Sequence, residues 1–231
     1  MRRGTKVVIV ATATLAIVGG GGYTVFALLA GGGEAPAALP SASFQPASVV
    51  SGATADGTWN LDASPSFVGY RVREKLAILS APSDAVGRTT AIMGTLSISG
   101  RQVTKVDVTA DLTQLQSDRS MRDQRIHSVG LETDRFPTAT FTLTKPIAFD
   151  AVPAQGTEVD VKATGNLTLH GVTKTVVFPL RARWAGDTID VAGPLAVQFA
   201  DYGIQAPNSG FVTTEDHGTI ELQLRFTRAS A

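Results

Sequence analysis

Apolar and polar residues alternate through most of the chain after residue 57, and the parity of this alternation changes at one informative place. Between residues 159 and 169 the apolar side chains occupy odd positions, whereas between residues 176 and 184 they occupy even positions. Alternation with period two is typical of a β-strand with one buried face. Since cross-strand partners in an antiparallel hairpin have a constant sum of residue numbers, a two-residue turn at His170-Gly171 places odd and even positions on the same face. The predicted partners are Val161 with Leu180 and Ala163 with Phe178.

Similar alternation recurs in about eight or nine runs along the chain, most of them joined by short turns. Such a series, with one helical interruption, fits an up-and-down β-barrel better than a Greek-key sandwich. The last run, Ile220–Phe226, is expected to pair with the first, Trp59–Leu61, because closure of a barrel removes its exposed edges. Two stretches without alternation, Lys75–Gly87 and Asp201–Thr214, are predicted to be loops because they contain Pro and Gly.

One short helix is predicted inside the β pattern. Ser120 is expected to be its N-cap, with the acidic Asp123 three positions later, and Gly130 is expected to end it. The Phe136-Pro137 pair then requires extended backbone at Phe136, so the next strand is expected to begin there.

The first thirty residues differ from all that follows. Three basic residues precede Val7–Ala30, an uncharged run whose 24 residues make roughly 36 Å of helix, enough to cross a bilayer core of about 30 Å. The basic flank predicts a cytoplasmic tail at residues 1–6 and an extracytoplasmic remainder. A single-pass anchor in the cell membrane is favoured by the length of the run. A signal sequence cut near Ala30-Gly31, which would give a secreted protein, is the alternative.

Residues 31–56 are rich in Gly, Ala, Pro and Ser and predict a flexible linker, followed by a barrel domain at residues 57–228. The small residues Gly19–Gly22 leave a homodimer seam open as an alternative, so the oligomeric state is not fixed by the sequence.

Composition narrows the classes of function. The chain has no Cys, which excludes disulfides, thiolate metal sites and a lipid-modified Cys anchor. The three basic residues of the N-terminal tail leave 17 Lys and Arg against 20 Asp and Glu in the remainder, a net charge of about −3. Without a basic patch, nucleic acid is not an expected partner.

Few residues point to chemistry. The three histidines, His127, His170 and His217, have no metal-binding spacing, and the nucleophile motif G-x-S-x-G is absent. His170 is expected to hydrogen-bond within its turn. No enzyme activity, metal or required cofactor is therefore predicted.

The apolar parity defines a candidate barrel lining. Small residues on that face, Gly94, Ala110, Ala139, Ala163 and Gly165, are expected to leave room inside, although alternation alone cannot separate a filled barrel from one that holds a ligand. The predicted lining residues are Tyr70, Ile92, Leu96, Val106, Phe141, Leu143, Leu167, Leu169, Val176, Phe178, Leu180 and Leu222.

Between Gly57 and Arg228 the chain carries a series of short motifs. They are Trp59-x-Leu61-Asp62, Arg122-Asp123-x-x-Ile126, Leu131, Phe136-Pro137-x-Ala139-x-Phe141, the run Gly165–Lys174 (GNLTLHGVTK) and Asp201–Ile204. Together, and in this order, these segments resemble the YceI-like family. Pro65-Ser66 stands where the family often has His-Ser.

This resemblance implies a lipocalin-like, eight-stranded antiparallel barrel that binds a long isoprenoid lipid, such as a quinone or a polyprenyl phosphate. It implies export and supplies no catalytic residues. On this basis Arg122 and Lys174 are candidate head-group contacts at the rim, and a solvated helix face is the alternative for Arg122. The predicted protein is membrane-tethered and sequesters, transports or protects its lipid. A ligand-free structural or adaptor barrel and an enzyme acting on isoprenoid lipids are the alternatives.

Overall fold

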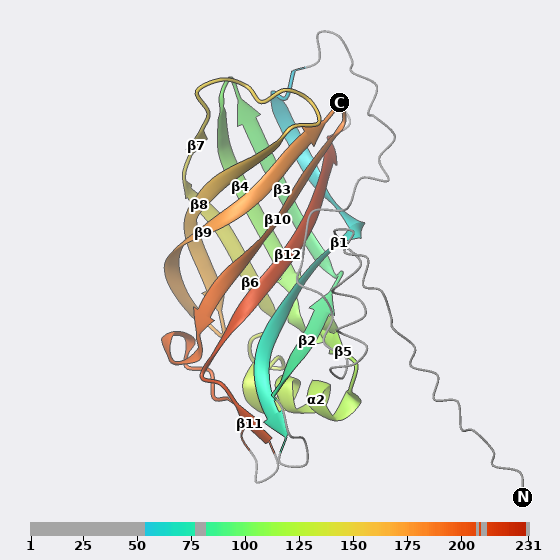
Figure 1. Cartoon of the computed structure of the whole chain (residues 1–231), viewed down its shortest axis with the longest axis vertical. Coiled ribbons are helices and arrows are strands. Elements are labelled where there is room, and N and C mark those ends of the chain that lie inside the picture. Colours follow the sequence, from blue (N-terminus) through green and yellow to red (C-terminus); the bar gives the residue numbers. More distant parts are fainter. Residues whose placement is uncertain (1–53, 77–81, 207, 209–211, 230–231) are drawn as a thin grey trace, which may run out of the picture.

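Eight antiparallel strands form a closed barrel in the computed structural model, which describes residues 54–76, 82–206, 208 and 212–229 (Figure 1). The strands follow one another around the barrel in sequence order, as predicted for an up-and-down topology. The barrel strands are β1 (Gly57–Leu76), β3 (Ile92–Ser99), β4 (Gln102–Asp111), β6 (Thr138–Lys145), β8 (Glu158–Leu169), β9 (Val172–Ala185), β10 (Thr188–Gln198) and β12 (His217–Arg228).

The predicted anchor, residues 7–30, and residues 31–53 of the predicted linker lie outside the described residues. Among the described helices, none has the length and apolar character needed to span a membrane.

The hairpin made by β8 and β9 has the predicted register. Val161 pairs with Leu180, and Ala163 pairs with Phe178. The turn residues His170 and Gly171 both have positive φ, of 50° and 72°. This backbone matches the twist of the flanking strands, which explains why Gly follows His at the turn.

The first and last strands close the barrel, as the sequence predicted. The register between β1 and β12 runs from Trp59 with Arg228 to Arg71 with Thr219, with a shift between Asp62 and Phe67. Ser66 occupies this irregularity and is only 1% exposed. Its hydroxyl donates to the Asp62 carbonyl at 2.6 Å and accepts from the Arg225 amide at 2.8 Å, so the side chain replaces the missing ladder bonds.

One end of the barrel carries additional short elements, drawn at the bottom of Figure 1. The prediction of a loop over Lys75–Gly87 was wrong for its last part, because β2 (Ser83–Thr89) pairs with the second half of β1. Likewise, β11 (Val212–Thr214) lies within the second predicted loop and pairs with the end of β1. The remaining short elements at this end are η1 (Leu112–Gln114), β5 (Gln116–Ser117) and η3 (Phe199–Tyr202), whereas β7 (Ile147–Ala148) pairs with the start of β4 at the other end (Figure 1).

The helical insert is α2 (Ser120–Arg125) followed by a π-turn, η2 (Ile126–Gly130), which ends at the predicted glycine. Its predicted cap was wrong. Arg119 is the N-cap residue and makes no side-chain cap bond, while Asp123 accepts bonds from the amide and hydroxyl of Ser117 at 2.9 and 2.6 Å. The carboxylate therefore ties the helix to β5 in place of a capping box.

Candidate functional site

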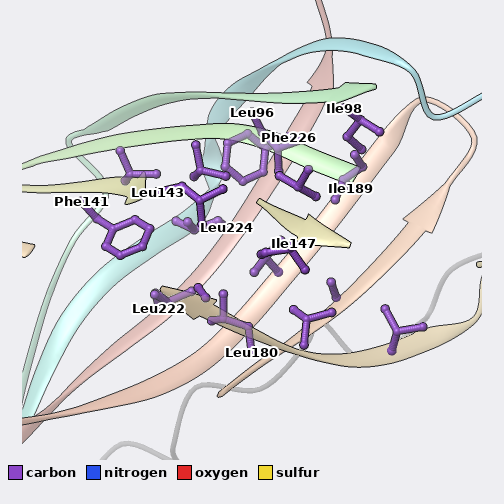
Figure 2. Close-up of a pocket in the computed structure, with 18 of the residues that line it drawn as sticks. Leu96, Ile98, Phe141, Leu143, Ile147, Leu180, Ile189, Leu222, Leu224 and Phe226 are labelled. Atoms are coloured by element: carbon purple, nitrogen blue, oxygen red, sulfur yellow. The ribbon is translucent and has the colours of Figure 1, made fainter. Parts of the chain in front are cut away.

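The barrel interior holds an inner chamber of about 180 Å³ whose walls are almost wholly apolar (Figure 2). It reaches from the middle of the barrel to β7 and the loop that follows it. Eight of the predicted lining residues border it: Leu96, Val106, Phe141, Leu143, Leu167, Phe178, Leu180 and Leu222.

Aromatic rings shape the inner chamber. Phe141 and Phe178 meet edge to face, with 5.4 Å between their ring centroids. Gly165 does not leave the room expected of it, because a Cβ there would lie 2.4 Å from the Phe141 ring, which covers the glycine. The alanines Ala110, Ala139 and Ala163 do border the chamber. The free space therefore depends on alanine positions, since the space beside Gly165 is taken.

An outer chamber of about 700 Å³ lies at the end of the barrel that carries α2. It shares Val68, Ala139 and Ile220 with the inner chamber, and we call these three residues the waist. Val68 and Ile220 lie on the neighbouring strands β1 and β12, whereas Ala139 lies on β6, halfway around the barrel. The two chambers therefore adjoin at the waist, whose residues come from opposite walls of the barrel.

The wall of the outer chamber combines apolar side chains with one charged pair. Arg122 lies on α2, and its Nη2 atom donates to Oε1 of Glu74 on β1 at 2.6 Å, while its Nη1 contacts Asp118. Glu74 is buried, and these carboxylates raise the pKa of Arg122 against the effect of its own partial burial. The predicted rim arginine thus borders the chamber with two acidic partners already in place.

Tyr70, another predicted lining residue, borders the outer chamber together with Leu169. Its phenol oxygen is fully buried and makes no hydrogen bond of good geometry within the described chain, although Ser117 is near enough to influence its pKa. Burial raises the pKa of Tyr70 well above its ordinary value, and the charge of Arg122 opposes this effect.

A raised phenol pKa makes stability depend on alkaline pH. Since the unfolded chain releases this proton near pH 10 and the folded chain holds it, the contribution of Tyr70 to the free energy of unfolding should be constant below about pH 10 and fall as pH rises further. Tyr70→Phe should flatten this decline and be nearly neutral at pH 7, because the lost hydroxyl has no hydrogen bond. Urea unfolding at pH 7 measures the effect of the substitution on stability, and urea unfolding across the alkaline range measures the decline with pH. Burial also raises the pKa of Tyr202, so part of the alkaline decline in the free energy of unfolding should remain in Tyr70→Phe. Tyr202→Phe is the matched comparison. An unchanged alkaline slope in Tyr70→Phe would contradict the prediction.

The prediction that His170 hydrogen-bonds within its own turn was wrong, because both ring nitrogens have partners in distant segments. Its Nδ1 lies 3.0 Å from the Tyr202 carbonyl oxygen and its Nε2 lies 2.9 Å from Oε2 of Glu132, while Phe136 lies against the ring. The imidazole thereby joins the hairpin turn to η3 and, through Glu132, to the segment that follows the helical insert. Within the described part of the chain, no group of three His, Asp or Glu side chains is arranged to hold a metal.

Three predicted site residues do not border either chamber. Ile92 packs in the core cluster around Trp59, and Val176 packs against the second core cluster. Lys174 is half exposed and pairs with Asp201 at 3.0 Å, so the expectation that it reaches the rim was wrong. The turn places it beside η3, where a carboxylate is available.

The outer chamber also includes residues that the sequence did not indicate. Several come from the helical insert and the β2 region, whose positions depend on tertiary packing and not on strand parity. Glu74 lies between a predicted strand and the predicted loop that begins at Lys75, and no role was predicted for it. The unpredicted residues include Glu74, Ala85, Leu115, Met121, Ile126 and Leu131.

A closed eight-stranded antiparallel barrel with an apolar interior and one short helical insert beside its mouth defines a lipocalin-like fold. The sequence model of the YceI-like domain matches residues 59–226, and the chain belongs to this family.

Two relatives illustrate the similarity in sequence. A UPF0312 protein of Vibrio parahaemolyticus is 30% identical over 141 residues, which cover 57% of this chain and 71% of that protein. Protein YceI of Salmonella arizonae is 38% identical over 84 residues, which cover 36% of this chain and 40% of the relative.

Two solved structures share the fold. A polyisoprenoid binding domain from Saccharophagus degradans, implicated in plant cell wall breakdown, aligns with a TM-score of 0.59 and 21% identity over 74% of this chain and 98% of that one. BcnA of Burkholderia cenocepacia aligns with a TM-score of 0.55 and 19% identity over 71% of this chain and 98% of that one.

Proposed function

We propose that this protein binds a long-chain isoprenoid lipid, such as a quinone or a polyprenyl phosphate, inside its barrel. The proposal includes a membrane tether at residues 7–30 and an extracytoplasmic barrel that sequesters, transports or protects the lipid. The observation that carries it is the pair of largely apolar chambers that meet at the waist inside one barrel.

The shape and chemistry of this space suit an isoprenoid. Small-molecule sites usually measure about 300–1,000 Å³ and have mostly apolar walls with a few polar groups. The outer chamber falls in this range and carries its polar groups at the end near α2, whereas the inner chamber is almost free of them. A polar head beside Arg122 and Tyr70 and an apolar tail beyond Ala139 would match this distribution. Each buried methylene contributes about 0.8 kcal/mol.

A ligand-free adaptor barrel is the main alternative, since an eight-stranded barrel can fill itself with side chains. The volume of the outer chamber favours a ligand. An enzyme acting on the same lipids has less support, because neither the sequence nor the described site supplies a nucleophile paired with a base.

Purification of the full chain followed by solvent extraction and mass spectrometry tests the proposal. The protein should carry an isoprenoid lipid in nearly stoichiometric amount, above the level retained by an unrelated single-pass membrane protein purified in the same detergent. A ligand-free protein that also rejects added quinones and polyprenols would favour the adaptor function. Turnover of an added lipid would favour the enzyme.

A further inference from the structure

The helical segment Ser120–Gly130, which we call the lip, forms part of the wall of the outer chamber and also faces solvent. Met121, Arg122, Arg125 and Ile126 all border the chamber. Met121 is nevertheless 79% exposed, so the outer chamber reaches the molecular surface beside it. The lip is therefore one boundary of the chamber at which a lipid would enter from the surface.

Apolar side chains stand out on the lip. Met121 and Val129 are 79% and 50% exposed, and both belong to the few large apolar side chains that the described part of the chain leaves in solvent. They lie eight residues apart with Arg125 midway between them, so the three side chains follow one another along one side of the helical segment. Met121 and Val129 are at least half exposed, so burial of their side chains requires a partner, whereas Arg122 of the same segment pairs with Glu74 of the barrel.

The charges of the lip favour an anionic partner. Arg119 is half exposed and lies 3.7 Å from Asp118, which it shares with Arg122, while Arg125 is exposed without an acidic partner at ion-pair distance among the described residues. The two aspartates of the same region are engaged, because Asp118 contacts Arg122 and Asp123 accepts two bonds from Ser117. Exposed apolar side chains interspersed with arginines are the combination that binds the interface of an anionic bilayer.

We propose that the lip docks on the surface of an anionic phospholipid bilayer and so places the opening of the outer chamber against it. This inference rests on the proposed lipid-binding function, because an isoprenoid leaving the bilayer at this opening avoids exposing its methylenes to water. Met121 belongs both to the wall of the outer chamber and to the proposed docking surface, since it borders the chamber and is exposed.

The chain is long enough for this orientation. The barrel begins at Gly57, at the end opposite the lip, and β1 runs 20 residues toward the lip (Figure 1). At about 3.3 Å per residue β1 spans at most roughly 66 Å. Residues 31–56 can reach roughly 90 Å when fully extended. An anchor at residues 7–30 therefore does not prevent the lip from meeting the same bilayer.

The absence of Cys from the chain permits a direct test. Single cysteines replace Met121 or Val129 in the full chain and carry a thiol-linked fluorophore. The protein is then placed in vesicles of equal parts phosphatidylcholine and phosphatidylglycerol that contain brominated acyl chains. Matched controls are Met93→Cys and Val177→Cys, which are exposed apolar positions on strands of the barrel wall, and Val152→Cys near the opposite end.

Labels at positions 121 and 129 should be quenched by the brominated lipid, and the three control labels should not. Combining Arg119→Gln with Arg125→Gln should lower the ratio of docked to undocked protein about tenfold or more in these vesicles, and should have little effect in phosphatidylcholine alone. Uniform quenching, no quenching, quenching only at position 152, or failure to associate with vesicles would overturn the proposal. Proximity between labels on two molecules would instead indicate that the lip binds a second copy of the chain. The lipid content of the same samples, measured by mass spectrometry, separates failure of docking from failure of lipid binding.

Discussion

Replacing Ala139 with Phe is expected to weaken the binding of a long isoprenoid such as solanesol by at least about 100-fold. Ala139 is the waist residue contributed by β6, and Val68 and Ile220 approach from the opposite wall. A phenyl ring at this position should fill the passage and confine the ligand to the outer chamber. Since each methylene contributes about 0.8 kcal/mol, excluding even four of them costs about 3 kcal/mol, which exceeds 100-fold in affinity.

Short and long ligands make this prediction specific. Geraniol is short enough for the outer chamber alone, so its affinity should change little in Ala139→Phe. The matched control is Thr138→Phe, which introduces the same side chain one position earlier, on the exposed face of β6. Equilibrium binding measured by fluorescence, with thermal unfolding as the check of folding, distinguishes the variants. Equal losses for both ligands would contradict a passage at the waist, and an unchanged affinity for solanesol would show that the tail does not cross it.

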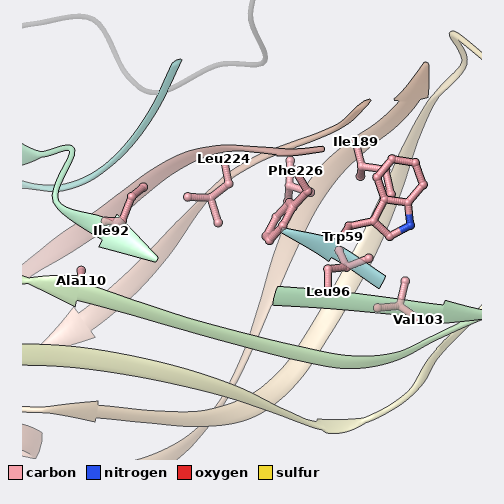
Figure 3. Packing of buried hydrophobic residues seen from close by; sticks show 9 residues of the cluster. Trp59, Ile92, Leu96, Val103, Ala110, Ile189, Leu224 and Phe226 are labelled. Carbon is pink, nitrogen blue, oxygen red and sulfur yellow. The ribbon is translucent and has the colours of Figure 1, made fainter. Parts of the chain in front are cut away.

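Replacing Trp59 with Ala is expected to lower the free energy of unfolding by about 3–5 kcal/mol. Trp59 is fully buried in the core cluster shown in Figure 3, together with Leu96, Ile189 and Phe226. Its indole N–H donates to the Ala55 carbonyl at 3.0 Å. The guanidinium of Arg228 lies 4.4 Å from the ring centroid, so one side chain connects the first strand to the last.

Urea unfolding followed by circular dichroism measures this loss. Met93→Ala on β3 is the control, because its side chain is 70% exposed and its loss should cost less than about 0.5 kcal/mol. A cost below about 1 kcal/mol for Trp59→Ala would show that the surrounding core collapses into the space, or that this end of the barrel contributes little to stability.

The sequence was sufficient to predict the parts of the fold that depend on strand parity. The register of β8 and β9 follows from the change of parity at His170-Gly171, because each side chain on one face fixes its neighbours two residues away. The same rule placed Phe141, Phe178 and Leu180 inside the barrel. Family resemblance then supplied the number of strands and the class of ligand, which alternation does not contain.

Parity was insufficient where contacts between distant segments decide the structure. The strand over Ser83–Thr89 was missed because Pro82 and Gly87 are typical of loops, whereas in the fold Gly87 lies under the Tyr70 ring, where a Cβ would come within 2.4 Å of the ring. Likewise, the burial of Glu74 depends on Arg122, which is distant in sequence and reaches it through the helical insert. Lys174 has the parity of a lining residue, but Asp201 offers it a closer partner.

The pairing of β1 with β12 also determines the order in which the chain can fold. The β8–β9 hairpin needs only residues that are close in sequence and can form early. Trp59 can pair with Arg228 only later, because nearly the whole barrel domain separates them in sequence. Until Arg228 has been synthesised, the sheet has two unpaired edges that can associate with other chains. Barrel closure is therefore expected to be a late and slow step of folding, and the step at which a nascent chain is most exposed to aggregation.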